Sequence, residues 1–177
     1  MEYRRIVISG GPSSGKTTII NRLQKEDYYC FAEVSRELIL ISQKKGIEQP
    51  FLDNPAQFNK DLLNARIDQF NKAETINSNV FYDRGVHDVI GYMYYGKQII
   101  PTLFIEGCNK CVYDQVFLLP PWQTIHVTDN ERYESFEQAT EIYKCLYKTY
   151  TEFGYKVTEV PTGTVNERKN FILKNIL

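Results

Sequence analysis

The amino-acid sequence predicts an α/β protein: a doubly wound parallel sheet of about five strands with helices on both faces. Short apolar runs rich in β-branched and aromatic residues alternate with longer segments whose apolar residues recur at helical spacing. Continuously apolar runs are typical of strands buried on both faces, and such strands pair in parallel. With 177 residues, 42% of them hydrophobic, the chain can build one core, so we expect a single domain over residues 1–177.

The expected strands are apolar runs that end at a charge or at a turn residue. The run 79–85 meets its first charge at Asp83, and the run 112–122 is stopped by Pro120 and Pro121, which cannot continue a strand. In chain order we expect strands at residues 4–9, 28–32, 79–85, 112–122 and 155–161.

The expected helices have apolar faces and recognisable ends. Gly46 ends the second and Gly154 the fourth, and the third begins with Asn54 as its cap and Pro55 in its first turn. In chain order we expect helices at residues 17–25, 35–45, 55–73, 136–153 and from 165 onward. Capping boxes are expected at the last two, formed by Ser135 with Gln138 and by Thr164 with Glu167.

Residues Gly10 to Thr17, GGPSSGKT, match the phosphate-binding pattern G-x-x-x-x-G-K-[ST] between a strand and a helix. Glycines let successive N–H groups turn toward an anion, and the following helix adds its positive end. Lys16 would bridge the terminal phosphates, and the Thr17 hydroxyl would bind magnesium. A glycine-rich turn with an exposed lysine fits less well, because the spacing and the flanking elements both match. The expected nucleotide contacts are Gly10, Gly11, Pro12, Ser13, Ser14, Gly15, Lys16, Thr17 and Thr18.

Asp83, Arg84 and Gly85 follow the third expected strand. In parallel sheets ligands bind at the carboxyl ends of the strands, so these residues should lie beside the phosphate-binding loop. Asp83 could hold magnesium through water or position an attacking hydroxyl, and Arg84 could neutralise charge on the transferred group. The alternative is an ion pair that closes the end of the strand, which we consider the weaker interpretation.

Glu33 and Arg36 follow the second expected strand. Glu33 could accept the proton of a substrate hydroxyl, and Arg36, about one helical turn later, could bind a substrate phosphate. Equally, Glu33 could cap or charge the start of a helix. The sequence leaves both readings open, and it also leaves open whether Glu33 or Asp83 is the catalytic base.

The polar segment 123–135, which contains Arg132, separates the fourth strand from a long helix. Its place in the topology favours a lid that brings Arg132 to the γ-phosphate, although a surface loop that pairs Arg132 with a nearby glutamate would have the same composition.

Two further groups of residues carry weaker signals. Cys108 and Cys111 have the spacing of a zinc ligand pair, but no second Cys or His pair is near, so we expect an ordinary loop. His87 and His126 are expected to face solvent or to be satisfied by hydrogen bonds.

The segment after Asp83 and the sequence around Asn109 bear on substrate recognition. Tyr92, Tyr94 and Tyr95 could stack on a substrate ring, but packing is the simpler role in a chain with 13 tyrosines. The guanine signature N-K-x-D is absent, because Asn109-Lys110 is followed two places on by Val112.

Charge and composition limit the partners and the compartment. Lys and Arg number 21 against 22 Asp and Glu, so no excess of positive charge favours a nucleic-acid backbone. No apolar run approaches the roughly 20 residues that span a bilayer, and the first residues lead into a strand rather than a signal peptide. The four cysteines are few and unevenly spaced, so we expect reduced thiols and a cytoplasmic protein.

These motifs together resemble the AAA-type group of predicted P-loop ATPases that includes the kinase domain of the NadR nicotinamide-riboside enzymes. The residues that carry the resemblance are Gly10 to Thr17, Glu33-x-x-Arg36, Asp83-Arg84-Gly85, YDQVFLLPPW, Asp129-x-x-Arg132 and GYKVTEVP. More distantly, the chain is similar to thymidylate and deoxynucleoside kinases. The resemblance implies a P-loop NTPase fold, ATP bound through Lys16 and Thr17, a lid arginine at Arg132, and activation of the acceptor by Asp83 or Glu33. NadR-type enzymes also carry an adenylyltransferase domain, which no part of this sequence resembles.

Two classes of function therefore remain. The first is a phosphotransferase that uses ATP and magnesium, with GTP as the alternative nucleotide, and acts on a small nucleoside-like or nucleotide-like acceptor. The second is a nucleotide-binding switch that hydrolyses ATP or GTP slowly and regulates a protein or lipid partner; the AAA-type group also contains eukaryotic proteins described as GTP- and lipid-binding. A degenerate loop that binds nothing is disfavoured, because Lys16, Thr17 and Asp83 are all present.

Overall fold

The computed structural model describes residues 3–126 and 134–176, and five strands in these ranges form one all-parallel sheet. The strands are β1 (Arg5–Gly10), β2 (Tyr29–Phe31), β3 (Val80–Asp83), β4 (Gln115–Leu119) and β5 (Val157–Glu159). Their order across the sheet is β2-β3-β1-β4-β5, with β1 in the centre. The predicted parallel α/β sheet is confirmed: β1 has the expected length but is displaced by one residue, and the other four strands are shorter than expected.

The register brings the carboxyl ends of the central strands to one edge of the sheet. Ile8 of β1 pairs with Asp83 of β3 on one side and with Phe117 of β4 on the other. The segments that leave β1, β2 and β3 therefore start from the same edge, which is where ligands bind in sheets of this kind.

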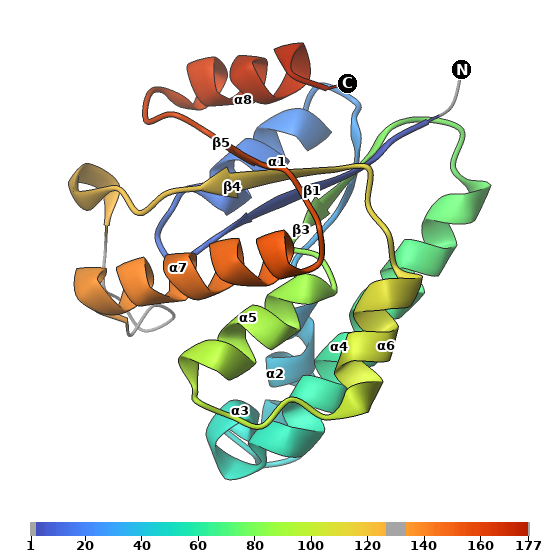
Figure 1. The fold of residues 1–177 in the computed structure, drawn as a ribbon, viewed down its shortest axis with the longest axis vertical. Helices are drawn as coiled ribbons and strands as arrows, with labels where there is room; N and C mark the ends of the chain where they lie inside the picture. Colours follow the sequence, from blue (N-terminus) through green and yellow to red (C-terminus); the bar gives the residue numbers. More distant parts are fainter. Residues whose placement is uncertain (1–2, 127–133, 177) are drawn as a thin grey trace.

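Helices cover both faces of the sheet (Figure 1). The helices are α1 (Lys16–Gln24), α2 (Val34–Lys44), α3 (Pro50–Asp53), α4 (Pro55–Lys72), α5 (His87–Tyr95), α6 (Thr102–Lys110), α7 (Phe136–Glu152) and α8 (Val165–Lys174), with short 3-10 turns η1 (Ala73–Thr75) and η2 (Gln123–Ile125). Alternate β1 side chains enter different cores: Ile8 packs with Ile19 of α1 and Ile172 of α8, whereas Val7 joins the core that contains Ile90 of α5.

Hydrogen-bonding caps explain where three of the predicted helices begin. The Asn54 side chain accepts a hydrogen bond from the Gln57 N–H at the start of α4. Both predicted capping boxes are confirmed, at Ser135 before α7 and at Thr164 before α8.

Three helices, α3, α5 and α6, were not predicted. α3 is a single turn that begins at Pro50. The helix α6 also corrects the expected loop at the cysteine pair, because Cys108 lies in its last turn and Cys111 is its C-cap.

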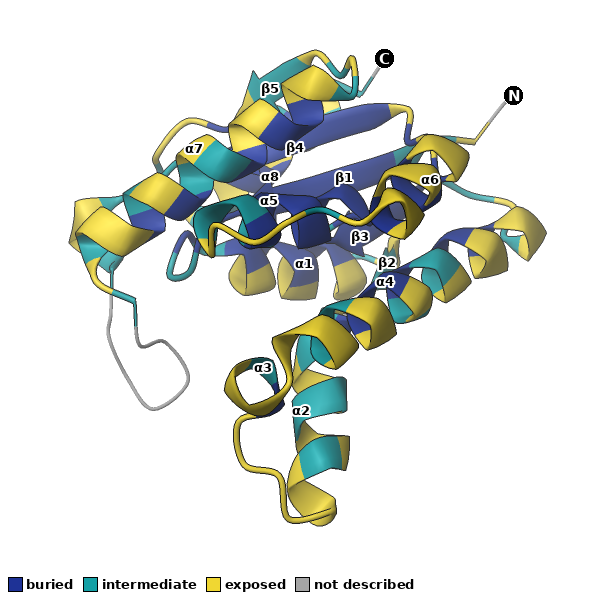
Figure 2. Cartoon of the chain, turned by 60° about the horizontal axis from the view of Figure 1, so that its bottom comes forward, coloured by how far each residue is buried: buried dark blue, intermediate teal, exposed yellow. Residues whose placement is uncertain are grey.

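The α2–α3–α4 region projects from the body of the molecule. Figure 2 shows α2, α3 and the first turns of α4 extending away from the sheet, with mostly exposed or half-buried surfaces. The side chains of Leu40, Ile41 and Leu52 are exposed in this region. No helix within residues 3–126 and 134–176 is long and apolar enough to cross a bilayer.

Helices α5 and α7 pack closely because a glycine lies at their contact. A Cβ added at Gly91 of α5 would stand 2.7 Å from Leu146 Cδ2 and 3.3 Å from Leu146 Cα in α7. Leu146 is itself fully buried and packs with Leu118 of β4.

We predict that Gly91→Ala lowers the free energy of unfolding by about 1–2 kcal/mol. The clash with Leu146 costs roughly 1–3 kcal/mol, and the better helix propensity of alanine offsets part of it. Urea denaturation followed by circular dichroism measures the change, with the exposed α7 substitution Glu141→Ala as a control expected to stay within about 0.5 kcal/mol. An unchanged midpoint for Gly91→Ala would contradict the close α5–α7 contact.

Candidate functional site

The predicted phosphate-binding loop connects β1 to α1 at the carboxyl edge of the sheet. Three of its residues have positive backbone φ angles: 151° at Gly10, 54° at Ser13 and 83° at Gly15. These left-handed conformations are readily adopted by glycine and are needed for a loop that curls around an anion.

The two first glycines are also required by their neighbours. A Cβ on Gly10 would lie 2.7 Å from the carbonyl oxygen of Leu119 in β4, and a Cβ on Gly11 would lie 2.9 Å from the carbonyl oxygen of Ala139 in α7. The loop is therefore fixed between β4 and the first turns of α7.

Lys16 is the first residue of α1, and its side chain is folded into the loop. Its Nζ donates hydrogen bonds to the Gly11 carbonyl oxygen at 2.7 Å and to Ser14 Oγ at 3.2 Å. Burial, together with the nearby positive charge of Arg84, lowers the pKa of Lys16 to about 7. Thr17 and Thr18 are exposed on the same first turn, where a helix N-terminus favours anions.

Arg168 of α8 contacts the loop from the face of the sheet opposite to α7. Its Nη2 donates a hydrogen bond to the Ser14 carbonyl oxygen at 2.9 Å, and its guanidinium lies 5.7 Å from the centre of the Trp122 ring. No sequence motif marks Arg168, because a basic residue in a helix is indistinguishable from a surface residue until the fold places it against the loop.

Asp83 ends β3 and is buried beside the loop. Its Oδ1 has no hydrogen-bond partner within the described residues. Burial and the negative charge of Glu33 raise the pKa of Asp83 above its usual value. The positive charges of Lys16, Arg84 and Arg66 oppose this rise, but none of these groups forms a hydrogen bond with Oδ1 within the described residues.

Glu33 caps α2 and pairs with two arginines. Its Oε1 accepts hydrogen bonds from the Ser35 N–H and from Arg66 Nη2 at 2.9 Å, and its Oε2 lies 2.5 Å from Arg84 Nε. Although burial opposes ionisation, Arg66 and Arg84 lower the pKa of Glu33 to about 2. The local reading of Glu33 as a cap is therefore correct, and the same carboxylate also reaches the residues after β3.

Arg84 connects the segments that follow β1, β2 and β3. Its Nη1 donates to the Gly10 carbonyl oxygen at 2.9 Å, while its Nε faces Glu33. The guanidinium also lies 5.0 Å from the ring centre of Tyr92. The structure thus brings together the phosphate loop, Glu33 and Asp83–Arg84, which the sequence analysis placed at one edge of the sheet.

Two predicted site residues, Arg36 and Arg132, are not part of this buried cluster of charges. Arg36 is exposed on the first turn of α2. Arg132 lies outside the described residues, as does most of the predicted lid.

Several site residues were missed, and they are buried polar groups outside recognisable motifs. Arg66 of α4 donates to Glu33 and, through Nη1, to the Gly85 carbonyl oxygen at 3.1 Å. Asp88, in the first turn of α5, is fully buried and contacts Ser9 and Tyr150. Around Arg84, the positive charges of Lys16 and Arg66 lie near the carboxylates of Glu33, Asp83 and Asp88.

The two histidines differ from each other. His87 was expected to be exposed or satisfied, but it is buried among Tyr113, Tyr150, Phe153 and Tyr155, and its Nδ1 has no hydrogen-bond partner in the described part of the chain. Burial lowers the pKa of His87 to about 4, so the ring is neutral at physiological pH. The ring of His126 forms a hydrogen bond with the Glu134 carbonyl oxygen at 3.1 Å.

The cysteine pair has the environment of a packed core. Cys108 and Cys111 are buried, and burial raises the pKa of both thiols. Across the described ranges 3–126 and 134–176, no group of three or more His, Cys, Asp or Glu side chains is arranged to hold a metal ion.

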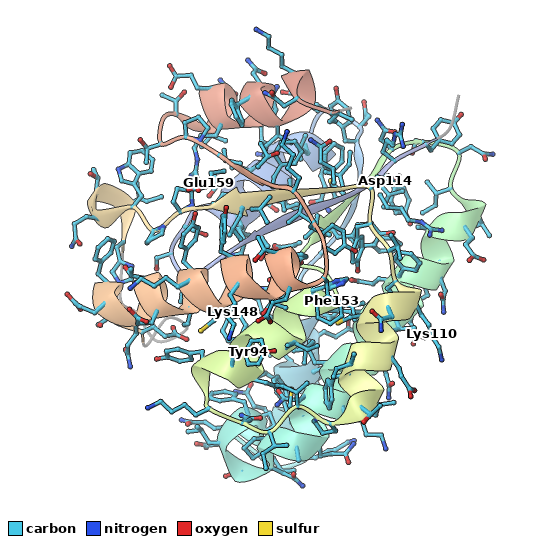
Figure 3. The ribbon with its side chains drawn as sticks, viewed as in Figure 1. Tyr94, Lys110, Asp114, Lys148, Phe153 and Glu159 are labelled. Carbon is cyan, nitrogen blue, oxygen red and sulfur yellow. The ribbon has the colours of Figure 1, made fainter. Side chains whose placement is uncertain are left out.

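A separate groove of about 550 Å³ lies between α5, α6 and the end of α7. Ile90, Ile105 and Phe153 contribute apolar surface, and Tyr94 lies beside Lys148 (Figure 3). The phosphate loop touches Ala139 at the beginning of α7, so the groove is about 20 Å away along that helix. The groove is therefore distinct from the phosphate loop.

Comparisons with known proteins agree with the fold and the loop. A family model described as an AAA domain matches residues 5–168. No curated protein sequence matches significantly. Among solved structures, a deoxyadenosine kinase from M. mycoides with products dCMP and dCDP bound has a TM-score of 0.71 at 19% identity, with 96% of this chain and 97% of that chain covered.

The NadR protein gives a similar match over part of its length. Its complex with NR has a TM-score of 0.70 at 20% identity and covers 97% of this chain, and its complex with NAD and AMP-PNP has a TM-score of 0.66 at 20% identity and covers 96%. In both, the chain spans 48% of the NadR chain. These likenesses show that the fold is that of the P-loop nucleoside kinases.

We predict that Glu33 makes stability depend on pH in the acid range. Because its pKa is lower in the folded protein than in the unfolded chain, its stabilising contribution is complete above about pH 5 and is lost as the pH falls toward 2. Chemical denaturation of the wild type and Glu33→Gln should show the difference in their free energies of unfolding shrinking by about 2 kcal/mol between pH 6 and pH 3. Because the charge of Glu33 raises the pKa of Asp83, both proteins are compared in the Asp83→Asn background, where the Asp83 titration is absent. A difference that stays constant with pH would show that Glu33 is not held by Arg66 and Arg84.

Proposed function

The chain belongs to the AAA-domain family, and on this premise we propose that it is an ATP- and magnesium-dependent phosphotransferase that acts on a nucleoside-like or nucleotide-like acceptor. The observation that carries the proposal is the position of Arg84, which contacts the phosphate loop at Gly10 and the carboxylate of Glu33. A protein that only bound a nucleotide would need the loop, but not a buried arginine that links it to an anionic group on the next segment.

On the nucleotide side, residues Gly10–Thr18 would bind the phosphates of ATP. The curled loop and the first turn of α1 offer backbone N–H groups, and Lys16 can turn from Gly11 and Ser14 to the terminal phosphates. A phosphate beside Lys16 would favour its charged form and so oppose the effect of burial on its pKa.

The residues present fit a magnesium ion. Asp83 supplies a buried carboxylate oxygen without a hydrogen-bond partner among the described residues, and Thr17 supplies an exposed hydroxyl at the start of α1. Both are hard oxygen ligands of the kind that Mg²⁺ prefers, alongside phosphate oxygens and water. When bound, the ion would neutralise charge on the transferred phosphoryl group.

On the acceptor side, Glu33 would receive the acceptor hydroxyl and Arg84 would face the transferred group. A carboxylate with a pKa of about 2 is ionised at neutral pH but is a weak base. A weak base is sufficient to position the acceptor hydroxyl, because phosphoryl transfer depends mainly on alignment and charge neutralisation. Arg36 on α2 would contact a charged acceptor, and Arg132 of the predicted lid would neutralise charge at the γ-phosphate.

The known ligands of the structural neighbours suggest which acceptors to try. The M. mycoides enzyme is a deoxyadenosine kinase with dCMP and dCDP bound, and NadR has been solved with NR. These support a small acceptor with a ribose or deoxyribose hydroxyl.

We predict that one such acceptor accelerates ADP formation from ATP and magnesium at least 100-fold. The assay measures ADP with the purified protein alone and with deoxyadenosine, deoxycytidine, their monophosphates or nicotinamide riboside. Lys16→Ala should abolish the stimulated rate, because it removes the cation that bridges the phosphates. A slow rate that no acceptor changes, together with a partner protein that binds one nucleotide state, would support the switch function instead.

We predict that the two carboxylates separate kinetically. Glu33→Gln should keep the affinity for ATP but lower kcat about 100-fold, because it loses a group that acts on the acceptor. Asp83→Asn should lower kcat and also raise the magnesium concentration needed for half-maximal rate. Titrations of ATP, acceptor and magnesium measure each effect, and identical magnesium dependence in both variants would contradict this division of roles.

A further inference from the structure

Asp88 is a fully buried carboxylate close to the site that no motif of the sequence identified. It lies in the first turn of α5, four residues after Arg84, and its side chain is 0% exposed. A buried charge of this kind is costly unless each of its oxygens has partners, so its hydrogen bonds indicate what it does.

Both oxygens of Asp88 accept hydrogen bonds from separate parts of the fold. Oδ1 accepts from Ser9 Oγ of β1 at 2.5 Å and from Arg84 Nη1 at 3.3 Å. Oδ2 accepts from the Gly85 N–H at 2.9 Å and from the Tyr150 hydroxyl of α7 at 2.5 Å. Four donors on two oxygens are the environment of an ionised carboxylate.

Arg84 needs such support because its own backbone is in an unfavourable conformation. Its φ angle is 73°, in the left-handed region that non-glycine residues rarely adopt and that persists only when the surroundings enforce it. The Gly85 N–H bond to Asp88 fixes the peptide that follows Arg84, and the Arg84 bond to Asp88 fixes the side chain.

Two of the three nitrogens of the Arg84 guanidinium have partners among the described residues. Nε faces Glu33, and Nη1 is shared between the Gly10 carbonyl oxygen and Asp88. Nη2 makes no hydrogen bond to any residue that the structure describes, and the side chain retains 11% exposure.

We propose that Asp88, held by Tyr150 and Ser9, is a positioning residue that fixes the Arg84 guanidinium and leaves its Nη2 available to the transferred phosphoryl group. The inference rests on the proposed phosphotransferase function. Tyr150 links the position of Asp88 to that of the phosphate loop. It lies on α7, the helix whose Ala139 carbonyl oxygen is close to Gly11 of the loop. Helix α7 therefore helps to position both the phosphate loop and, through Asp88, the Arg84 side chain.

The test removes one hydroxyl. Tyr150→Phe keeps the ring that stacks on His87 and loses only the hydrogen bond to Asp88. We expect kcat to fall 10- to 30-fold while KM for ATP changes less than 2-fold. Tyr155→Phe is the matched control, since it removes a tyrosine hydroxyl that accepts from the Tyr113 N–H and does not contact Asp88; its kcat should stay within 2-fold of the wild type.

The double variant distinguishes positioning from a general structural loss. If Tyr150 acts through Arg84, then Tyr150→Phe should have less than a 2-fold effect on kcat in the Arg84→Ala background. Independent effects, in which the two losses multiply, would overturn the proposal, and so would an unchanged kcat in Tyr150→Phe alone.

A second readout does not depend on turnover. By NMR, exchange of the Arg84 Nη1 protons with solvent should be at least 10-fold faster in Tyr150→Phe than in the wild type or Tyr155→Phe, because Nη1 donates to Asp88. If no acceptor is ever phosphorylated, this exchange rate still decides whether Asp88 and Tyr150 hold Arg84. Failure of the proposed function can therefore be distinguished from failure of this inference. Equal exchange rates in all three proteins would overturn the inference.

Discussion

Burial of the Arg84 guanidinium is the interaction on which the rest of the site depends. A buried cation without partners would destabilise the fold by several kcal/mol, so oxygen atoms must approach it from several directions. The fold meets this demand with Glu33 after β2, the Gly10 carbonyl at the end of β1 and Asp88 in α5. Segments separated by up to 74 residues are thereby fixed to one another at the carboxyl edge of the sheet.

The same charges hold the projecting α2–α4 region in place. The hydrophobic core holds α4 through Leu62, Leu63 and Phe70, but most of α2 is exposed or half-buried, so apolar packing contributes less to α2. Instead, Glu33 caps α2 and pairs with Arg66 of α4, whose other nitrogen donates to the Gly85 carbonyl. The orientation of α2 relative to α4 and the sheet thus depends on ionic hydrogen bonds, which require defined geometry, in addition to the apolar contacts of α4.

The sequence predicts the parallel sheet and the phosphate loop because each depends on local patterns. An apolar run that meets its first charge at Asp83 marks β3, and the spacing together with the flanking strand and helix identifies Gly10–Thr17. Helix α5 escaped prediction for a physical reason: most of its residues are buried, so it lacks the polar face that gives a helix its period, and Gly91 lies in its middle. The sequence does not predict the roles of Asp88, Arg66 and Arg168. A charged residue reads the same in the sequence whether it is buried or exposed, and only tertiary contacts distinguish the two cases.

The contact between Arg168 and the Ser14 carbonyl oxygen joins residues 154 positions apart. Because a chain is synthesised from its N-terminal side, the phosphate loop leaves the ribosome well before the helix that supports it. During synthesis the loop therefore emerges long before its arginine, and the nascent chain cannot acquire the finished loop until α8 has docked. Contacts of such large sequence separation slow folding, so completion of the loop should coincide with the last stage of folding rather than the first.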